Sequence, residues 1–154
     1  MASTETILDA VKTRIASQFE THRAALAAEL AATIPTYKAL EKFDVLNPEY
    51  PSIEILPSST DVEYYDGQIY DEGMEETGLT LRVTMADFTP SVVGLLLLRY
   101  REILKRIVKA DPTFGGTLYR VRMGKADWAI MTKSQEAQKI AQELYQDLRV
   151  LTEY

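Results

Sequence analysis

The sequence of 154 residues contains no cysteine and a single histidine, His22. The absence of cysteine excludes disulfides, thiolate catalysis and zinc sites built on cysteine. One histidine excludes the HExxH motif and every metal site with several histidines. The patterns GxSxG, GxGxxG and GxxxxGK[ST] are also missing, so no nucleophile elbow, dinucleotide fingerprint or phosphate loop is present. We expect His22 to be structural, and we expect no catalytic residue, no cofactor and no metal ion.

Positive charge is missing from one long segment of the chain. No Lys or Arg lies between Phe43 and Leu81, a segment that holds ten of the 23 acidic residues. The net charge of -6 therefore comes from this segment, because the remainder carries 17 basic and 13 acidic residues, a net of +4. Eight basic residues fall between Arg99 and Lys125. Opposite regions of this kind allow head-to-tail self-association, although two solvated faces of one domain are the simpler explanation.

Long hydrophobic runs are missing as well. The longest, Val92 to Leu98, is interrupted by Gly94 and falls far short of the roughly 18 residues of a membrane span. Residues 1–9 lack the basic and apolar regions of a signal peptide. We expect no membrane association. The length and the 46% of hydrophobic residues predict a single domain over residues 1–154, and the pI of about 4.9 argues against sequence-specific DNA binding.

The first third of the chain predicts a long helix. Apolar residues recur mostly at spacings of four, which places them on one face of a helix over residues 4–33. Ser3 or Thr4 caps its start, and Pro35 ends it, because proline disfavours helical geometry in the residue before it.

A second helix is predicted over residues 90–110, with Thr89 as its cap and Pro90 at its first position. Its first half is apolar all round, so we expect one side to pack on a sheet and another on a partner chain. Four residues of this helix are candidates for a subunit interface: Leu95, Leu98, Arg101 and Lys105.

Alternation of apolar and polar residues predicts strands over 52–56, 79–85 and 118–123. Residues 35–51 carry three prolines and little periodicity, which favours a loop with one helical turn. Residues 124–135, with Trp128 as a core or interface anchor, are predicted as a loop or a further strand. The periodicity of the C-terminal segment leans towards a helix, and an edge strand fits it nearly as well.

Residues 58–77 form an acidic arm, predicted as a long loop or an extended β-hairpin. Residues 61–67 resemble part of a calcium loop but fail the EF-hand template, since Tyr65 takes a ligand position and Gly67 falls one place late. Tyrosine is common at interfaces, so three tyrosines of the arm are candidates for a subunit interface: Tyr64, Tyr65 and Tyr70. The candidate channel-facing or partner-facing acids are Asp61, Glu63, Asp66, Asp71, Glu72, Glu75 and Glu76.

Taken together, the order of elements and three short motifs resemble the tail terminator (tail completion) proteins of tailed bacteriophages and related neck proteins. The motifs are the strand Pro51-Ser-Ile-Glu-Ile-Leu-Pro57, the Leu-Leu-Leu-Leu-Arg-Tyr-Arg-Glu-Ile-Leu run after Pro90, and the turn Asp111-Pro-Thr-Phe-Gly-Gly116 before a strand. The resemblance covers most of the chain, but the arm of this chain is longer and more acidic than the family pattern.

The resemblance implies an α+β fold: a mixed, mainly antiparallel β-sheet flanked by a long N-terminal helix and a central helix at about 90–110. It also implies that residues 138–152 form a strand of that sheet, against the lean of their periodicity. The family has no catalytic residues to carry over.

The function that the resemblance implies is a homo-oligomeric ring, with six copies expected, on the end of the tail tube. Its partners would be itself, the tail tube protein and the head connector or stopper protein, with genomic DNA passing through the channel without sequence-specific binding. We expect the protein in the virion, and in the host cytoplasm during assembly. The alternatives are another neck component, such as a head-completion or connector adaptor protein, and, remotely, a small acidic divalent-metal hydrolase.

Overall fold

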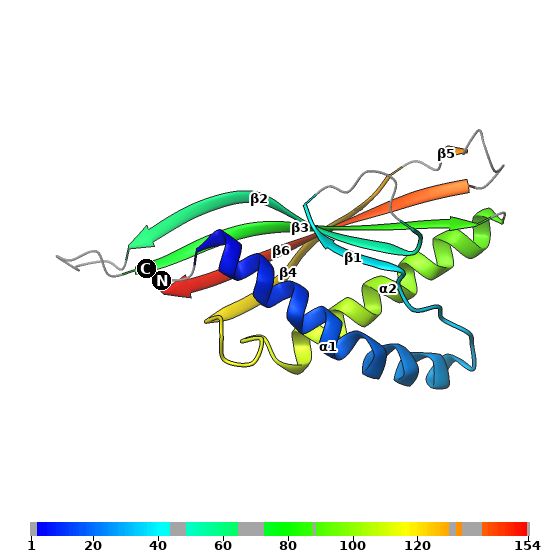
Figure 1. Ribbon diagram of the computed structural model, residues 1–154, viewed down its shortest axis with the longest axis horizontal. Helices are drawn as coiled ribbons and strands as arrows, with labels where there is room; N and C mark the ends of the chain where they lie inside the picture. Colours follow the sequence, from blue (N-terminus) through cyan, green and yellow to red (C-terminus); the bar gives the residue numbers. More distant parts are fainter. Residues whose placement is uncertain are drawn as a thin grey trace.

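A computed structural model describes residues 3–43, 49–64, 73–87, 89–129, 132–133 and 140–153. One sheet contains all the described strands in the order β1-β2-β3-β6-β4, with β5 beside β6. Both helices cover the same face of this sheet (Figure 1). The predicted α+β class, with a mixed, mainly antiparallel sheet, is therefore confirmed. The elements are α1 (Thr4–Leu30), β1 (Ala39–Lys42), β2 (Ser52–Tyr64), β3 (Gly73–Asp87), α2 (Pro90–Ala110), β4 (Arg120–Trp128), β5 (Thr132–Lys133) and β6 (Ile140–Glu153).

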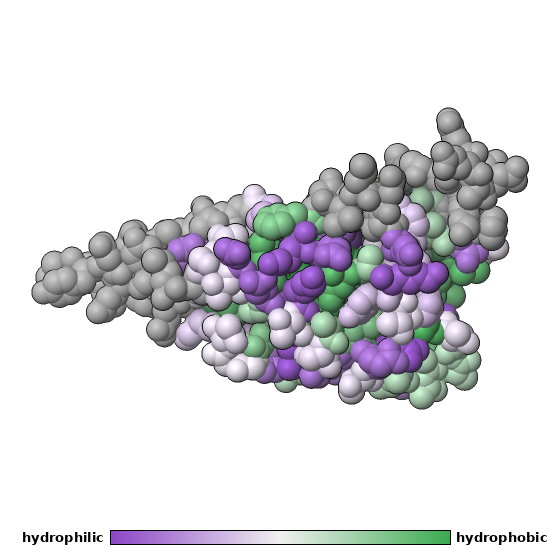
Figure 2. All heavy atoms as spheres, in the orientation of Figure 1, coloured by the Kyte–Doolittle hydropathy of each residue, from purple (hydrophilic) through white to green (hydrophobic). Residues whose placement is uncertain are grey.

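Helix α1 starts at its predicted cap and ends three residues before the predicted end. The Ser3 hydroxyl accepts a hydrogen bond from the Thr6 N–H at 3.1 Å. At the other end Ala31 takes a left-handed conformation with φ of 47°, which stops the helix before Pro35 can act. Figure 2 shows hydrophilic residues along the middle of α1 and weakly hydrophobic ones where it ends. Its buried residues are Ile7, Leu8, Val11, Ile15, Phe19 and Leu26.

Strand β3 alternates as its sequence predicts and extends beyond 79–85. Leu79, Leu81, Val83 and Met85 are buried on the face that the helices cover. The intervening residues lie on the opposite face, which we name the second face. Strand β2 also exceeds its predicted bounds, because it continues through Pro57 with a bulge between Pro57 and Ser59. A bulge accommodates a residue that has no N–H for the ladder.

The C-terminal segment is a strand, as the resemblance implied and against its periodicity. β6 pairs antiparallel with β3 from Met74–Glu153 to Asp87–Ile140 and with β4 on its other side. A spacing of four, as between Leu144 and Leu148, fits both a helix and one face of a strand. The periodicity therefore did not discriminate, and the pairing on both sides decided the structure.

The prediction of a loop with one helical turn over residues 35–51 was wrong at residues 39–42, whereas the other described residues of this segment lie outside helices and strands. It contains β1, which runs parallel to β2 with Ala39 opposite Ser52. The four residues of β1 include no β-branched or aromatic side chain, so no local preference marks them as a strand. Their pairing with β2 supplies the reason.

Helix α2 confirms the prediction over 90–110, with one correction at its start. Thr89 is the N-cap residue, but its hydroxyl makes no capping hydrogen bond; instead the Asp87 carboxylate accepts from the Thr89 N–H at 3.2 Å. The helix packs on β3, β6 and β4 and against α1. Strand β4 starts two residues later than the predicted start at 118. It continues to Trp128, so the first part of residues 124–135, predicted as a loop or a further strand, is a strand.

Tyr100 joins α2 to α1 and to the chain after it. Its ring is buried and meets the Phe19 ring at a centroid distance of 5.1 Å. The hydroxyl donates to the Pro35 carbonyl oxygen at 2.6 Å. Burial raises the pKa of Tyr100 well above its usual range, so the phenol keeps the proton that it donates.

We predict that Tyr100→Phe lowers the free energy of unfolding by about 1–3 kcal/mol, because it leaves the Pro35 carbonyl without its donor. Urea denaturation followed by circular dichroism measures the change. Tyr119→Phe is the matched control, since Tyr119 is exposed, and it should leave the midpoint unchanged. Equal effects of the two substitutions would contradict the assignment.

Candidate assembly surfaces

The described part of the acidic arm is an extended hairpin, which was one of its two predicted forms. Asp61 and Glu63 lie in β2 opposite Glu76 and Met74 of β3. β3 pairs with β6 along this stretch too, with Glu75 opposite Thr152. The base of the arm is therefore part of a three-stranded sheet. Tyr64 ends β2, whereas five candidates lie outside the described residues: Tyr65, Asp66, Tyr70, Asp71 and Glu72.

Glu76 is paired with basic residues of its own chain. Its carboxylate lies 3.6 Å from the Arg149 guanidinium of β6 and 4.0 Å from that of Arg122 in β4. These two arginines are register partners, and like charges directly opposite each other repel. Glu76 offsets that repulsion. This candidate acid therefore stabilises the contact of β3 with β6 and β4, and its side chain is only 20% exposed.

A second ion pair lies in the second face of the sheet, between β2 and β3. The Glu54 carboxylate accepts from Nε of Arg82 at 3.1 Å and from one of its terminal nitrogens at 2.6 Å. The Glu54 side chain is 2% exposed. Removing one partner of a buried pair costs about 3–5 kcal/mol, because the other charge stays in a low-dielectric site. The pair thus fixes the register of β2 against β3.

Tyr145 continues this row onto β6, where it is the register partner of Arg82. Its hydroxyl donates to the Glu143 carboxylate. That hydrogen bond raises the pKa of Tyr145 above its ordinary value, and burial adds to the effect. The sequence places Glu54 and Arg82 between apolar neighbours of a strand, but only the register brings them and Tyr145 together.

Helix α2 carries an exposed apolar stripe on the face turned away from the core. Leu95 and Leu98 are 47% and 54% exposed, and Val92 is 38% exposed. Spacings of three residues place them on one side of the helix. Val93 and Leu97 are buried. Of the two contacts expected of this helix, the one with the sheet is therefore present within this chain. We name Val92, Leu95 and Leu98 the α2 stripe.

The two basic candidates of α2 differ in their surroundings. Lys105 is exposed, but Nε of Arg101 donates to Oε1 of Gln146 at 3.1 Å. Gln146 is buried and donates through Nε2 to the carbonyls of Gly124 and Asp147, both at 3.0 Å. Arg101 therefore ties α2 to the bulge in β4.

Gln146 is a structural residue that sequence reasoning missed. The bulge that it supports lies between Met123 and Ala126 of β4. A Cβ atom at Gly124 would lie 3.1 Å from Cβ of Asp147, so glycine allows this close approach. A glycine within a strand pattern often marks a bulge, and Gly124 was the indication available.

The Asp111–Gly116 motif forms a tight turn between α2 and β4. Asp111 Oδ1 accepts from the Thr113 hydroxyl at 2.6 Å and from its N–H at 3.0 Å, and Oδ2 accepts from the Gly115 N–H at 2.8 Å. Gly115 and Gly116 take φ of 77° and 81°, which glycine adopts without strain. These hydrogen bonds, led by the one from the Thr113 hydroxyl, lower the pKa of Asp111.

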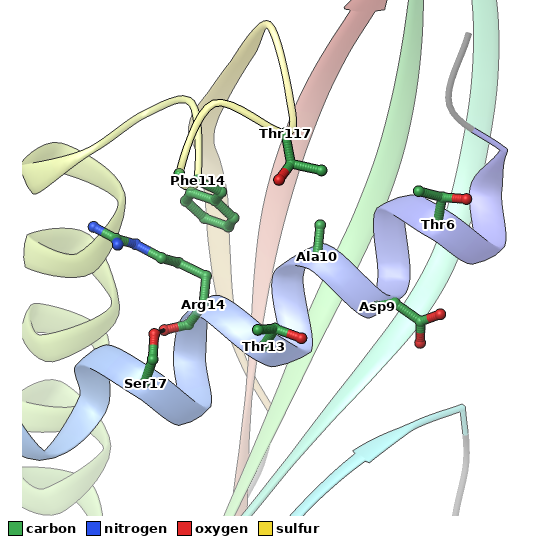
Figure 3. A pocket seen from close by; sticks show the side chains of 9 residues that line it. Thr6, Asp9, Ala10, Thr13, Arg14, Ser17, Phe114 and Thr117 are labelled. Carbon is green, nitrogen blue, oxygen red and sulfur yellow. Dashed lines mark hydrogen bonds between the residues drawn. The ribbon is translucent and has the colours of Figure 1, made fainter.

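A groove of about 400 Å³ lies between this turn and the first half of α1. Figure 3 shows Phe114 of the turn, and Thr117 just after it, above the part of the helix that carries Ala10 and Thr13. Its charged residues are Asp9 and Arg14, and Asp9 is engaged by Lys42. The groove brings together no pair of catalytic carboxylates and no nucleophile with a base.

Within the described ranges, no group of three or more His, Cys, Asp or Glu side chains is placed to hold a metal ion. Over the same part of the chain, no helix has the length and apolar character needed to cross a membrane. His22 is half-buried on α1. Burial, followed by the nearby charges of Arg106 and Arg14, lowers its pKa.

Comparison with known proteins gives little. No protein-family model matches the chain, and no curated protein matches it. Among solved structures it is similar to a chain of the virion of a native gene transfer agent particle, with 12% sequence identity, 88% of this chain and 92% of that chain covered, and a TM-score of 0.27. A TM-score this low carries no argument about function.

Asp111 should make the stability of the protein depend on acid pH. A carboxylate whose pKa is lowered by folding contributes stability above its unfolded pKa and loses it as pH falls through the folded value. We predict that Asp111→Asn is less stable than wild type at pH 7. The difference in the free energy of unfolding should narrow below the ordinary value of 3.8.

Urea denaturation of both proteins between pH 7 and pH 2.5 measures this difference. Asp127→Asn is the control, because Asp127 is exposed and forms a surface ion pair with Lys125, and such pairs contribute little. A difference between wild type and Asp111→Asn that stays constant down to the lowest pH would contradict the role of the Asp111 carboxylate.

Proposed function

We propose that this chain is a structural virion protein of the tail terminator class. Copies of it form a ring, six of them in the arrangement that the family resemblance implies. The ring caps the tail tube, ends tail growth and joins the tail to the head connector, and DNA passes through its channel. The protein catalyses no reaction and needs no cofactor; it resides in the virion after assembly in the host cytoplasm.

The observation that carries this proposal is the α2 stripe. Val92, Leu95 and Leu98 are large apolar residues in one row, and they remain exposed in the single chain. Burying such a row in a subunit contact removes apolar area from water, at roughly 25 cal/mol per Å². The stripe belongs to the Leu-Leu-Leu-Leu run, one of the motifs that resemble tail terminators, so motif and exposed surface coincide.

The second support is that polar groups of other parts of the chain are bound within the chain itself. In the turn from Asp111 to Gly116, the Asp111 carboxylate accepts hydrogen bonds from backbone N–H groups of the turn itself. Glu76 and Glu54 are paired with arginines. These groups are engaged in structure, which suits a protein whose work is assembly.

The remaining acids of the arm are proposed to face the channel or a neighbouring subunit. Asp61 and Glu63 occupy the stretch of β2 nearest the end of the hairpin, in a segment without any basic residue. A negative channel wall repels the phosphates of DNA, and negative charge on an outer surface attracts a basic neighbour.

We predict that the double substitution Leu95→Ser with Leu98→Ser abolishes ring formation and leaves the monomer folded, because both side chains are already exposed in the single chain. Mass photometry and sedimentation velocity, alone and with tail tube, measure assembly, and circular dichroism measures folding. The matched control is Leu30→Ser with Tyr119→Ser, which removes two equally exposed apolar side chains elsewhere.

A wild-type protein that stays monomeric at every concentration, with and without tail tube, would refute the ring. Deleting the gene separates a terminator from another neck component. Overlong or headless tails support a terminator, whereas heads that leak DNA indicate a head-completion or connector adaptor protein.

A further inference from the structure

Several edges of the sheet lack a partner among the described residues, and the two longest belong to β2 and β4. β1 pairs only with residues Ser52–Ile55 of β2, so the outer edge of β2 from Pro57 to Tyr64 is open. At the opposite side of the sheet, β4 pairs with β6 alone. Open edges offer rows of unpaired N–H and C=O groups, and these groups can pair with another chain.

The backbone geometry shows which groups are available on β2. The Ile55 carbonyl accepts from the Phe43 N–H of the β1 side at 2.9 Å, so Ile55 directs its polar groups outward. Outward and inward residues alternate along a strand, and the bulge after Pro57 shifts the phase by one. The outward backbone groups in the open stretch are therefore those of Thr60, Val62 and Tyr64.

On β4 the same alternation leaves part of the edge free. The Val121 N–H donates to the Pro112 carbonyl at 2.7 Å, so the molecule covers the start of this edge itself. The Ala129 N–H, just after β4, donates inward to the Glu143 carbonyl of β6 at 2.9 Å. Alternation from these two points leaves the backbone groups of Met123, Ala126 and Trp128 directed outward.

The two edges carry opposite charge. β2 contributes Asp61 and Glu63 with no basic residue, whereas β4 contributes Arg120, Arg122 and Lys125 against Asp127. By register, Asp61 is opposite Glu76, and Arg122 is opposite Arg149. Unlike edges attract and like edges repel, so this pattern disfavours β2–β2 and β4–β4 contacts.

We infer that the outer edge of β2 in one copy binds the outer edge of β4 in a second copy, so that their sheets join. In a rotationally symmetric ring every strand keeps its direction relative to the axis, and β2 runs antiparallel to β4 within a chain. The junction is therefore antiparallel. Among the registers that pair outward residues, we propose the one with Val62 beside Met123, because it brings acidic Glu63 next to basic Arg122 in the sequence of the two strands. The inference rests on the proposed ring for closure, and its charge pattern specifies a head-to-tail contact.

Cysteine cross-linking tests this junction in a chain that has no cysteine of its own. Within one chain β2 and β4 are three strand spacings apart, about 14 Å, which is beyond the roughly 7 Å limit for a disulfide. Glu63→Cys combined with Arg122→Cys should therefore give a ladder of covalent multimers on a non-reducing gel after mild oxidation. Reduction should collapse the ladder to the monomer.

Glu63→Cys with Ala16→Cys is the matched control, because Ala16 is exposed on α1, and it should give no ladder. Absence of a ladder from Glu63→Cys with Arg122→Cys overturns the inference. Dimers from Glu63→Cys alone also overturn it, since they would show that β2 meets β2.

A charge exchange tests the specificity of the same contact. Asp61→Lys with Glu63→Lys, and separately Arg120→Glu with Arg122→Glu, should each lose self-association in sedimentation velocity. A one-to-one mixture should regain it, because each variant then meets an edge of opposite charge. No recovery in the mixture overturns the electrostatic part of the inference. If the arginine variant does not fold by circular dichroism, Lys125→Glu replaces it, since Lys125 is 75% exposed.

The outcome is separable from the proposed function. A cysteine ladder together with normal tail length after gene deletion would keep the edge pairing and refute the terminator. Overlong tails after deletion, without a ladder, would keep the terminator and refute the edge pairing.

Discussion

The sheet depends on one long-range contact, the insertion of β6 between β3 and β4. β6 is the last element, yet it pairs with β3 along its length and provides the main partner of β4. Pairing β6 with β3 closes a long loop, and the conformational entropy that this costs is not offset by local structure. Burial of Leu144, Leu148 and Val150 beneath the helices offsets this cost. The open edge of β4 exists only because β6 holds β4 in place.

Charge in this molecule is arranged at two levels. Acids of the segment without bases meet basic residues from elsewhere in the chain: Glu76 contacts Arg122 and Arg149, and Glu54 pairs with Arg82. These ion pairs neutralise part of the charge separation that the sequence shows. β2, which contains Asp61 and Glu63, and β4, which contains Arg120, lie towards opposite sides of the sheet, and the proposed head-to-tail contact rests on this separation.

Sequence reasoning succeeded where structure is local. The stripe of α1, the Thr89-Pro90 start of α2 and the alternation of β3 each follow from side chains within a few positions. It failed for β1, whose four residues have no strand preference, and for the extension of β2 past Pro57. In both cases a neighbouring strand, rather than the segment itself, determined the structure. The candidate assembly surface was predictable only in part: Leu95 and Leu98 are exposed in the single chain, whereas Arg101 is bonded to Gln146.

By itself, the sequence determined the absence of thiol and multi-histidine chemistry, the positions of both helices and the separation of acidic from basic residues. These properties depend on composition and on short spacings, which no fold can alter. The tertiary structure alone decided that the C-terminal segment is a strand, that Glu76 and Glu54 are paired, and which leucines of α2 stay in water. The first two depend on strand pairing between residues far apart in the chain, and the third depends on how α2 packs on the sheet and on α1. Both are properties of the assembled fold.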